Sequence, residues 1–195
     1  HGAVQNIAVG YCLDGATWDS KPWVYAFDNS GNELWQKIYE GGDGTEVWKN
    51  YEFKAIRAVE GGYVISGSSY TEACCPYQHG NLLKINAAGD ILWETEIFPD
   101  HGAHGGAGLV ADTGGTLLTS SWHMGTQKLT TAVLDPTTGQ VTSQAVPFSS
   151  GSSTGMPIDY QAVGANQYMV VAPDTKNLTP QFCAPSGGNL TNVLV

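Results

Sequence analysis

One phrase that occurs three times limits the fold of this chain more than any other feature. Each copy consists of an apolar stretch, a turn rich in Asp, Asn and Gly, and a second stretch, and the copies are residues 24–35, 82–93 and 131–142. Their turn glycines, Gly31, Gly89 and Gly139, are about 50 to 60 residues apart. Each copy predicts a β-hairpin, because glycine supplies the positive φ that a tight turn needs.

A second predicted hairpin accompanies each copy, at residues 58–67, 109–120 and 162–171. Two hairpins per repeat give four antiparallel strands, and sheets of four strands at this period are typical of β-propeller blades. The sequence therefore predicts an all-β single domain of about four blades. The expected blade boundaries are about 1–50, 51–99, 100–150 and 151–195.

Both ends of the chain fall inside predicted blades. Residues 7–12 align with 64–69, and residues 192–195 align with 82–85, so the first and last blades are incomplete. We expect three, four, four and three strands in the successive blades. The pattern leaves three arrangements open: a small closed ring with two trimmed blades, part of a larger ring, or open blades that a neighbouring chain completes by strand addition.

The composition argues against nucleic-acid binding, since 18 acidic residues face only 8 basic ones and the net charge is −10. No stretch of apolar residues is long enough to predict a membrane span, and no signal peptide precedes His1. The four cysteines lack the paired spacing of a metal site, and charged residues make up only 13 %. These features favour a secreted, extracellular or periplasmic protein.

Four histidines fall in predicted connections on one face of the blades: His79, His101, His104 and His123. Imidazoles that converge in this way suit Zn or Cu. Loop carboxylates allow Ca²⁺ as well, although none follows the order of a calcium-binding loop. Histidines are also common in polar loops, so the alternatives are one divalent ion of this kind or no cofactor.

All four cysteines are predicted on the same face, and they are Cys12, Cys74, Cys75 and Cys183. In a closed ring Cys12 would pair with Cys183 and leave the adjacent pair Cys74 and Cys75. In an open arc Cys12 would pair with Cys74 or Cys75. The disulfide pattern therefore discriminates between the architectures.

Two tryptophans recur at one position of the repeat, Trp35 and Trp93, and this repetition predicts packing between neighbouring blades. When the three copies are aligned residue by residue without a gap, Thr142 stands at this position in the third copy. Aromatic residues in the connections are candidates for contact with sugars or with another protein, and they are Trp18, Trp23, Tyr77 and Trp122. Two sequons are candidate glycosylation sites, at Asn177 and Asn189.

The repeat resembles that of secreted bacterial β-propeller proteins, which read Gly-Gly-Tyr-x-x-x-Gly and then Asp-x-x-Gly-Asn-x-x-Trp. Here the first part is Gly61-Gly62-Tyr63 with Gly67, and the second runs from Asp28 to Trp35. The Asp-x-x-Gly-x-x-x-Trp part is also similar to the blade repeat of quinoproteins, propeller dehydrogenases that hold pyrroloquinoline quinone. Their eight blades, Ca²⁺ site and catalytic Asp have no counterpart here, so the resemblance concerns the repeat and not the site.

Two functions follow from these observations. The first is a non-enzymatic extracellular β-propeller that acts as a binding or assembly module, with a protein, a glycan or copies of itself as partner. The second is a secreted oxidoreductase that depends on a metal or a quinone and has its site on the face of the histidines and cysteines. The sequence assigns no catalytic residue to either.

Overall fold

The structure is a computed structural model of the chain. It describes residues 5–13, 20–39, 52–70, 78–97, 104–107, 111–112, 115–123, 128–145, 159–164, 167–173 and 190–194. Strands and short turns make up these residues, and they contain no helix. The search of these same residues for a helix long and apolar enough to cross a membrane finds none.

The first two sheets are antiparallel, and each is built from strands that follow one another in the chain. The first sheet has the order β1 (Asn6–Leu13), β2 (Ser20–Phe27) and β3 (Glu33–Ile38). The second sheet has the order β4 (Glu52–Val59), β5 (Gly62–Tyr70), β6 (Gln78–Ile85) and β7 (Ile91–Ile97).

The third sheet differs from its prediction in one strand. Its elements are β8 (His104–Ala107), β9 (Ala111–Asp112), β10 (Leu117–His123), β11 (Lys128–Leu134) and β12 (Val141–Ala145). Both β8 and β9 pair with β10, so two short strands share one edge where the sequence predicted a loop followed by one strand. The fourth sheet contains β13 (Asp159–Gly164), β14 (Gln167–Pro173) and β15 (Leu190–Leu194).

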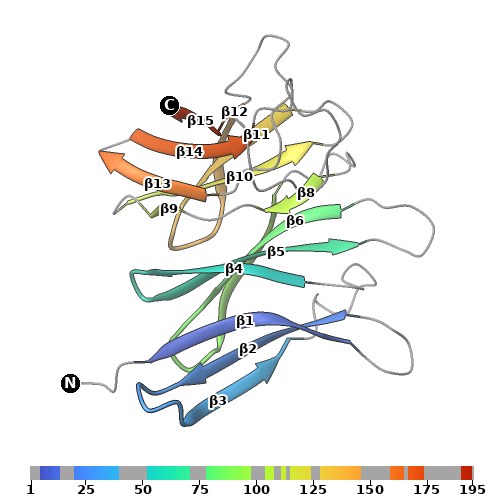
Figure 1. Ribbon diagram of the computed structural model, residues 1–195, viewed down its shortest axis with the longest axis vertical. Helices are drawn as coiled ribbons and strands as arrows, with labels where there is room; N and C mark the ends of the chain where they lie inside the picture. The colour runs from blue at the N-terminus through green and yellow to red at the C-terminus, as the bar shows by residue number, and fades with distance from the viewer. Residues whose placement is uncertain are drawn as a thin grey trace.

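The first three sheets stack in chain order from the bottom of Figure 1, and the fourth lies near the top at the height of the third. Among the described strands, no pairing joins the first sheet to the fourth. The all-β prediction and the series of antiparallel sheets are confirmed, whereas closure into a four-bladed ring is not. The assignment of residues 1–195 to one domain with four blade boundaries stays a prediction.

The interface between the first and second sheets and that between the second and third are apolar layers. Buried side chains between the first and second sheets are Val24, Tyr39, Phe53, Ile65, Leu83 and Ile85. Those between the second and third sheets are Val64, Leu82, Trp93, Ile97, Leu117, Ala132 and Leu134. The neighbours Leu82 and Leu83 lie in different layers because successive side chains of a strand point to opposite faces.

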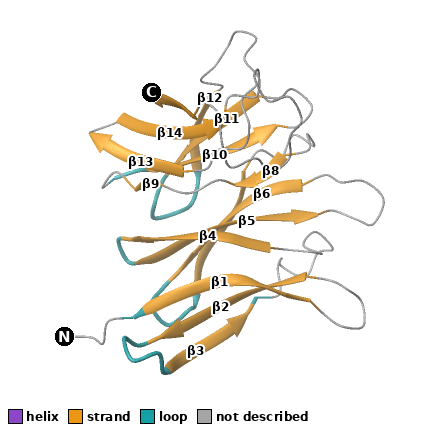
Figure 2. Ribbon diagram, viewed as in Figure 1, coloured by secondary structure: helices purple, strands orange, loops and turns teal. Residues whose placement is uncertain are grey.

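The repeated turns join the last two strands of each of the first three sheets, and Figure 2 shows the described turns as short connections. A glycine with φ between 72° and 82° lies in each of them, at Gly31, Gly89 and Gly139. The third turn is longer, since Asp135 N–H donates to Gln140 whereas Asp28 N–H donates to Asn32.

This longer turn corrects one prediction. Val133 pairs with Ser143 in the register that pairs Lys84 with Trp93 and Ala26 with Trp35. Ser143, and not Thr142, therefore occupies the tryptophan position of the third sheet.

Candidate functional site

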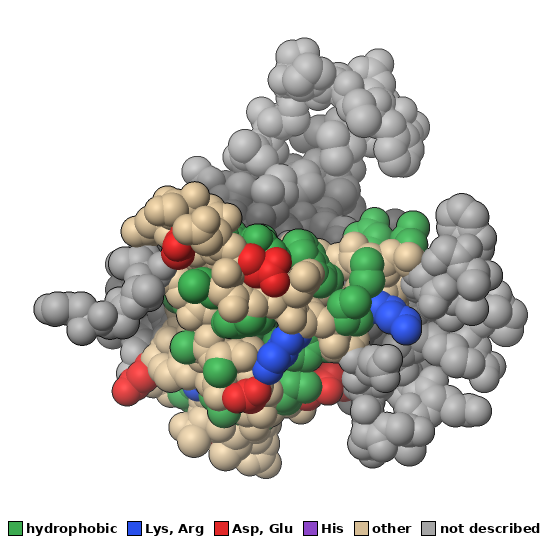
Figure 3. Space-filling view, turned by 90° about the horizontal axis from the view of Figure 1, so that it is seen from below, with side chains coloured by type: hydrophobic (Ala, Val, Ile, Leu, Met, Phe, Trp, Pro, Cys, Tyr) green, Lys and Arg blue, Asp and Glu red, His purple; other side chains and the backbone are tan. Residues whose placement is uncertain are grey.

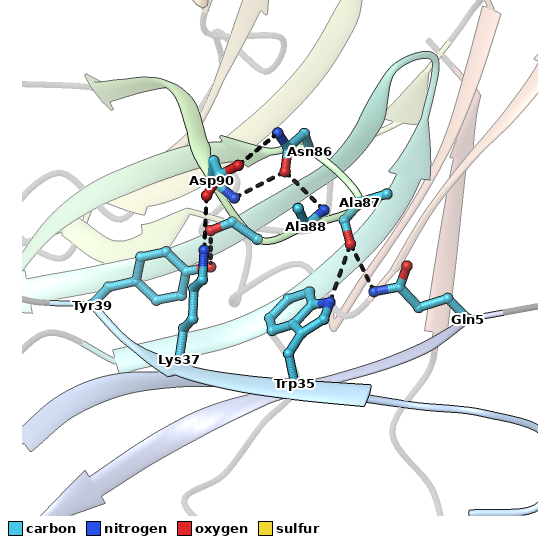
Figure 4. A network of polar contacts seen from close by, with 9 residues as sticks. Gln5, Trp35, Lys37, Tyr39, Asn86, Ala87, Ala88 and Asp90 are labelled. Carbon is cyan, nitrogen blue, oxygen red and sulfur yellow. Dashed lines mark hydrogen bonds and ion pairs between the residues drawn. The ribbon is translucent and has the colours of Figure 1, made fainter. Parts of the chain in front are cut away.

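Trp35 of the first sheet packs onto the turn of the second sheet. Its Nε1–H donates to the Ala87 carbonyl oxygen at 3.2 Å, as Figure 4 shows. A Cβ on the buried Gly89 would lie 2.8 Å from the Trp35 ring. Glycine is therefore required at position 89 for two reasons: the turn needs a positive φ, and the indole needs the space that a Cβ would fill.

Two further side chains fasten the same turn, one from β3 and one from the residue that directly follows β3. Lys37 Nζ lies 2.9 Å from Asp90 Oδ1, and the Tyr39 hydroxyl donates to the Gly89 carbonyl at 2.8 Å. The hydrogen bond from Lys37 is the main reason that the pKa of Asp90 lies below its usual range. Burial, together with the charge of Asp90, raises the pKa of Tyr39 to about 12. The tyrosine is thus held in its neutral, donating form.

Trp93 repeats this arrangement one sheet further along the stack. Its Nε1–H donates to the Pro136 carbonyl at 3.1 Å, which is the second turn position, as Ala87 is. A Cβ on Gly139 would lie 2.6 Å from the Trp93 ring. Thr95 Oγ1 donates to the Gly139 carbonyl at 2.8 Å, two residues after the tryptophan, where the preceding sheet has Lys37. The expected packing of Trp35 and Trp93 between sheets is confirmed.

The turn of the first sheet has the same backbone form but is open. Gly31 has φ 82°, and nothing lies within 4 Å of the position that a Cβ would take. Gly31 is exposed, whereas Gly89 and Gly139 are buried. No described residue therefore occupies the place that Trp35 and Trp93 fill on the other two turns.

The open turn is held in shape by its own carboxylate. Asp28 accepts hydrogen bonds from the Ser30 and Asn32 N–H groups at 2.8 and 2.9 Å. A third comes from Asn32 Nδ2, and this side-chain bond is the main reason that the pKa of Asp28 is lowered. Asn6 Nδ2 donates to Asn29 Oδ1 at 3.1 Å, which fixes the turn to β1.

Beside this turn, the first sheet carries a row of aromatic rings on the side away from the second sheet. Trp23, Tyr25 and Phe27 alternate along β2 with the buried Val24 and Ala26. Their ring centroids are 5.5 and 5.7 Å apart, with interplanar angles of 22° and 27°. We call the surface formed by Trp23, Tyr25 and Phe27 with their cross-strand neighbours Ala8, Gly10, Gln36 and Ile38 the outer face.

The rings of the outer face are half-buried by one another and by small neighbours. Trp23 Nε1–H donates to Gln36 Oε1 at 3.2 Å, and Gly10 lies beside the Trp23 ring. Ile38 is 55 % exposed. Figure 3, which looks at the molecule from this side, shows hydrophobic side chains spread over the surface, with acidic and basic side chains among them.

The sheet register shows what covers the equivalent surface elsewhere. The positions of Tyr25 and Phe27 correspond to Leu83 and Ile85 in the second sheet and to Ala132 and Leu134 in the third. All four of these residues are buried under the preceding sheet. In the second and third sheets, the surface equivalent to the outer face is thus covered by the preceding sheet.

Three of the predicted metal-site histidines lie in strands and not in connections. His104 of β8 is the cross-strand partner of His123 in β10, and His79 of β6 pairs with Ser69. His101 lies outside the described residues. A search of the described part of the chain for three or more metal-binding side chains finds none. The metal site stays a prediction.

Within the described part of the chain Cys12 has no disulfide partner, and its Sγ lies 3.6 Å from the Lys21 carbonyl oxygen. The other predicted disulfide partners, Cys74, Cys75 and Cys183, are outside the described residues, as are Trp18, Tyr77, Asn177 and Asn189. Trp23 and Trp122 were expected in loops, but both lie in strands, β2 and β10. The alternation of aromatic residues at 23, 25 and 27 indicates a half-buried strand, but it does not say which of its two sides stays uncovered.

Comparisons with known proteins leave the chain without a family. No protein-family model matches it, and neither does any curated protein. Among solved structures it is similar to BamB from Moraxella catarrhalis, with 13 % identity and a TM-score of 0.34. That match covers 83 % of this chain and 54 % of BamB, so the chain spans about half of the BamB chain.

Proposed function

We propose that this chain is a non-enzymatic extracellular binding and assembly module whose contact surface is the outer face of the first sheet. One observation carries the proposal. The surfaces equivalent to the outer face are buried between sheets at Leu83, Ile85, Ala132 and Leu134, whereas Tyr25 and Phe27 remain half-exposed. Large aromatic rings at such a place are typical of residues that dominate protein interfaces.

The ring geometry favours a protein partner over a glycan. A sugar stacks on the flat face of a ring, which must then point outward. In the outer face the rings of Trp23, Tyr25 and Phe27 lie nearly parallel and against one another. Their edges therefore make up much of the surface on offer, and ring edges pack well against apolar side chains of another protein.

Site-specific crosslinking tests the proposal. p-Benzoylphenylalanine replaces Tyr25 in the full chain, in the cells that produce it, and Thr142 on the exposed strand β12 serves as control. We expect one discrete crosslinked protein species from position 25 and none from position 142. Equal or absent crosslinking at the two positions would contradict a binding role for this face.

The cross-strand pair His104 and His123 supports a second candidate, the metal-dependent site. The two residues are Cα partners across β8 and β10, next to an irregularity in the pairing of these strands. Two imidazoles at such a place suit Zn or Cu if a third ligand joins them. Elemental analysis of the purified chain and of the His123→Ala variant tests this candidate: stoichiometric metal that the variant loses supports it, and metal-free wild-type protein contradicts it.

A further inference from the structure

We infer that the open turn Asp28–Asn32 binds a tryptophan side chain that a strand of a partner protein presents. The inference rests on the proposed function and names what the partner must offer. It comes from a comparison of the three repeated turns, of which two hold an indole ring and the first does not.

The two occupied turns define what an indole needs. A carbonyl at the second turn position accepts the Nε1–H, at Ala87 and at Pro136. A glycine gives space to the ring, because a Cβ there would lie 2.8 or 2.6 Å from it. The first turn meets both needs, since Asn29 stands at the second position and Gly31 has nearly the same φ as Gly89.

The acceptor that the open turn offers to an indole is the neutral carbonyl of Asn29, while the charged carboxylate of Asp28 is engaged within the turn. The Asp28 carboxylate already accepts three hydrogen bonds within the turn. The residue after the turn glycine is Asn32, where the second turn has Asp90 paired with Lys37 and the third has the uncharged Gln140. We therefore expect the partner strand to follow the third turn, with Ser or Thr two residues after its tryptophan, as Thr95 follows Trp93.

We take the occupant to be a different protein and not a second copy of this chain, because the three tryptophans whose side chains the structure describes are already bonded within the chain. Trp35 and Trp93 already donate to Ala87 and Pro136, and Trp23 donates to Gln36. Residues 151–195, which include the fourth sheet at the other end of the stack, contain no tryptophan. A second copy stacked with its fourth sheet against the outer face would thus bring no indole to Gly31.

N-Acetyl-L-tryptophanamide serves as the probe, because it carries the indole and the amide groups of a tryptophan residue. Titration into the ¹⁵N-labelled full chain is followed by the amide resonances of Gly31, Gly89 and Gly139. We expect a saturable shift at Gly31 and little change at the two turns that already hold an indole. The 1-methyl-indole analogue, which lacks the N–H donor, should bind about fivefold more weakly.

Three variants make the titration more specific. Gly31→Ala places a Cβ where the ring should lie and is expected to abolish the saturable shift, whereas Gly115→Ala, at another open position, should leave it unchanged. Trp35→Leu empties the second turn and should add a saturable shift at Gly89. This last variant shows that the probe can fill such a turn.

The inference is overturned if Gly31 shows no saturable shift in the wild-type chain, or if N-acetyl-L-phenylalaninamide and the 1-methyl analogue bind as well as the probe. A discrete crosslink from position 25 together with either result would leave the proposed function standing and remove only the tryptophan-binding turn. A crosslinked species with twice the mass of the chain would identify a second copy as occupant, and would contradict a different protein as partner.

Discussion

The indole nitrogen of Trp35 lies 3.2 Å from the carbonyl oxygen of Ala87, and this bond ties the first sheet to the turn of the second. Trp93 makes the equivalent bond to Pro136 at 3.1 Å. In both cases a ring from one sheet lies against the turn glycine of the next. The stack is therefore held by a repeated contact, and the first turn is the copy of it that remains open.

Loss of the second indole should destabilise the protein strongly. Trp93 is 7 % exposed, and Trp93→Ala leaves a cavity between the second and third sheets. We expect the free energy of unfolding to fall by about 3 to 5 kcal/mol. Ser143→Ala is the matched control, since Ser143 holds the equivalent position but is exposed, and it should change stability by about 0.5 kcal/mol or less. Urea denaturation of both variants measures the difference, and similar losses would contradict the assigned role of Trp93.

Tyr25 and Leu83 provide a test of whether the outer face is uncovered. They occupy equivalent register positions, but Leu83 is buried under the first sheet and Tyr25 is half-exposed. Leu83→Ala should cost about 2 to 5 kcal/mol, whereas Tyr25→Ala should cost about 1 kcal/mol. Thermal and urea unfolding check the order. A larger loss for Tyr25→Ala would mean that another surface covers this face in the free chain.

From the raised pKa of Tyr39 we expect the protein to lose stability at alkaline pH. Its pKa is raised from 10.0 to about 12 in the folded chain, because burial and Asp90 disfavour the phenolate. The stabilisation from this group is therefore complete below pH 10 and is lost as the pH rises toward 12. The loss in Tyr39→Phe should be smaller across this interval, although Tyr39→Phe starts lower because the bond to Gly89 is missing. Equal pH dependence of the two proteins would contradict the assignment.

From the lowered pKa values of the turn aspartates we expect the protein to lose stability at acidic pH. Hydrogen bonds lower the pKa of Asp28 and of Asp135, in Asp135 chiefly the bond from the Thr138 N–H. Their contribution is therefore present above pH 3.8, the ordinary value, and is lost as the pH falls through the lower folded values. NMR titration of the two carboxyl groups measures these pKa values directly. Values at or above 3.8 would contradict the turn geometry.

The sequence was sufficient for features that repeat. Hairpins with glycine turns follow from local chemistry, and the recurrence of Trp35 and Trp93 indicated contacts between sheets because packing residues repeat with the structural unit. The three strands of the first sheet and the four of the second agree with this pattern. Strand β8 was missed because His104-Gly-Gly-Ala107 has the composition of a loop and becomes a strand through pairing with β10.

The open face was hidden from the sequence for a different reason. Trp23, Tyr25 and Phe27 alternate as in any half-buried strand, and only the stacking order shows that no other described sheet covers their side. The prediction of the residue at the tryptophan position of the third sheet was wrong by one: the sequence indicated Thr142, and the structure places Ser143 there. Pairing across the longer turn fixes that register, and the length of a repeat does not.

The glycines of the three turns test the central claim, that the first turn is open and the other two are filled. All three have positive φ, so substitution by alanine costs each about 1 kcal/mol of backbone strain. In Gly89→Ala and Gly139→Ala the new Cβ also meets an indole ring, which should add about 1 to 3 kcal/mol. Urea denaturation of the three variants is predicted to give a small loss for Gly31→Ala and clearly larger losses for the other two. Equal losses at all three positions would contradict the account.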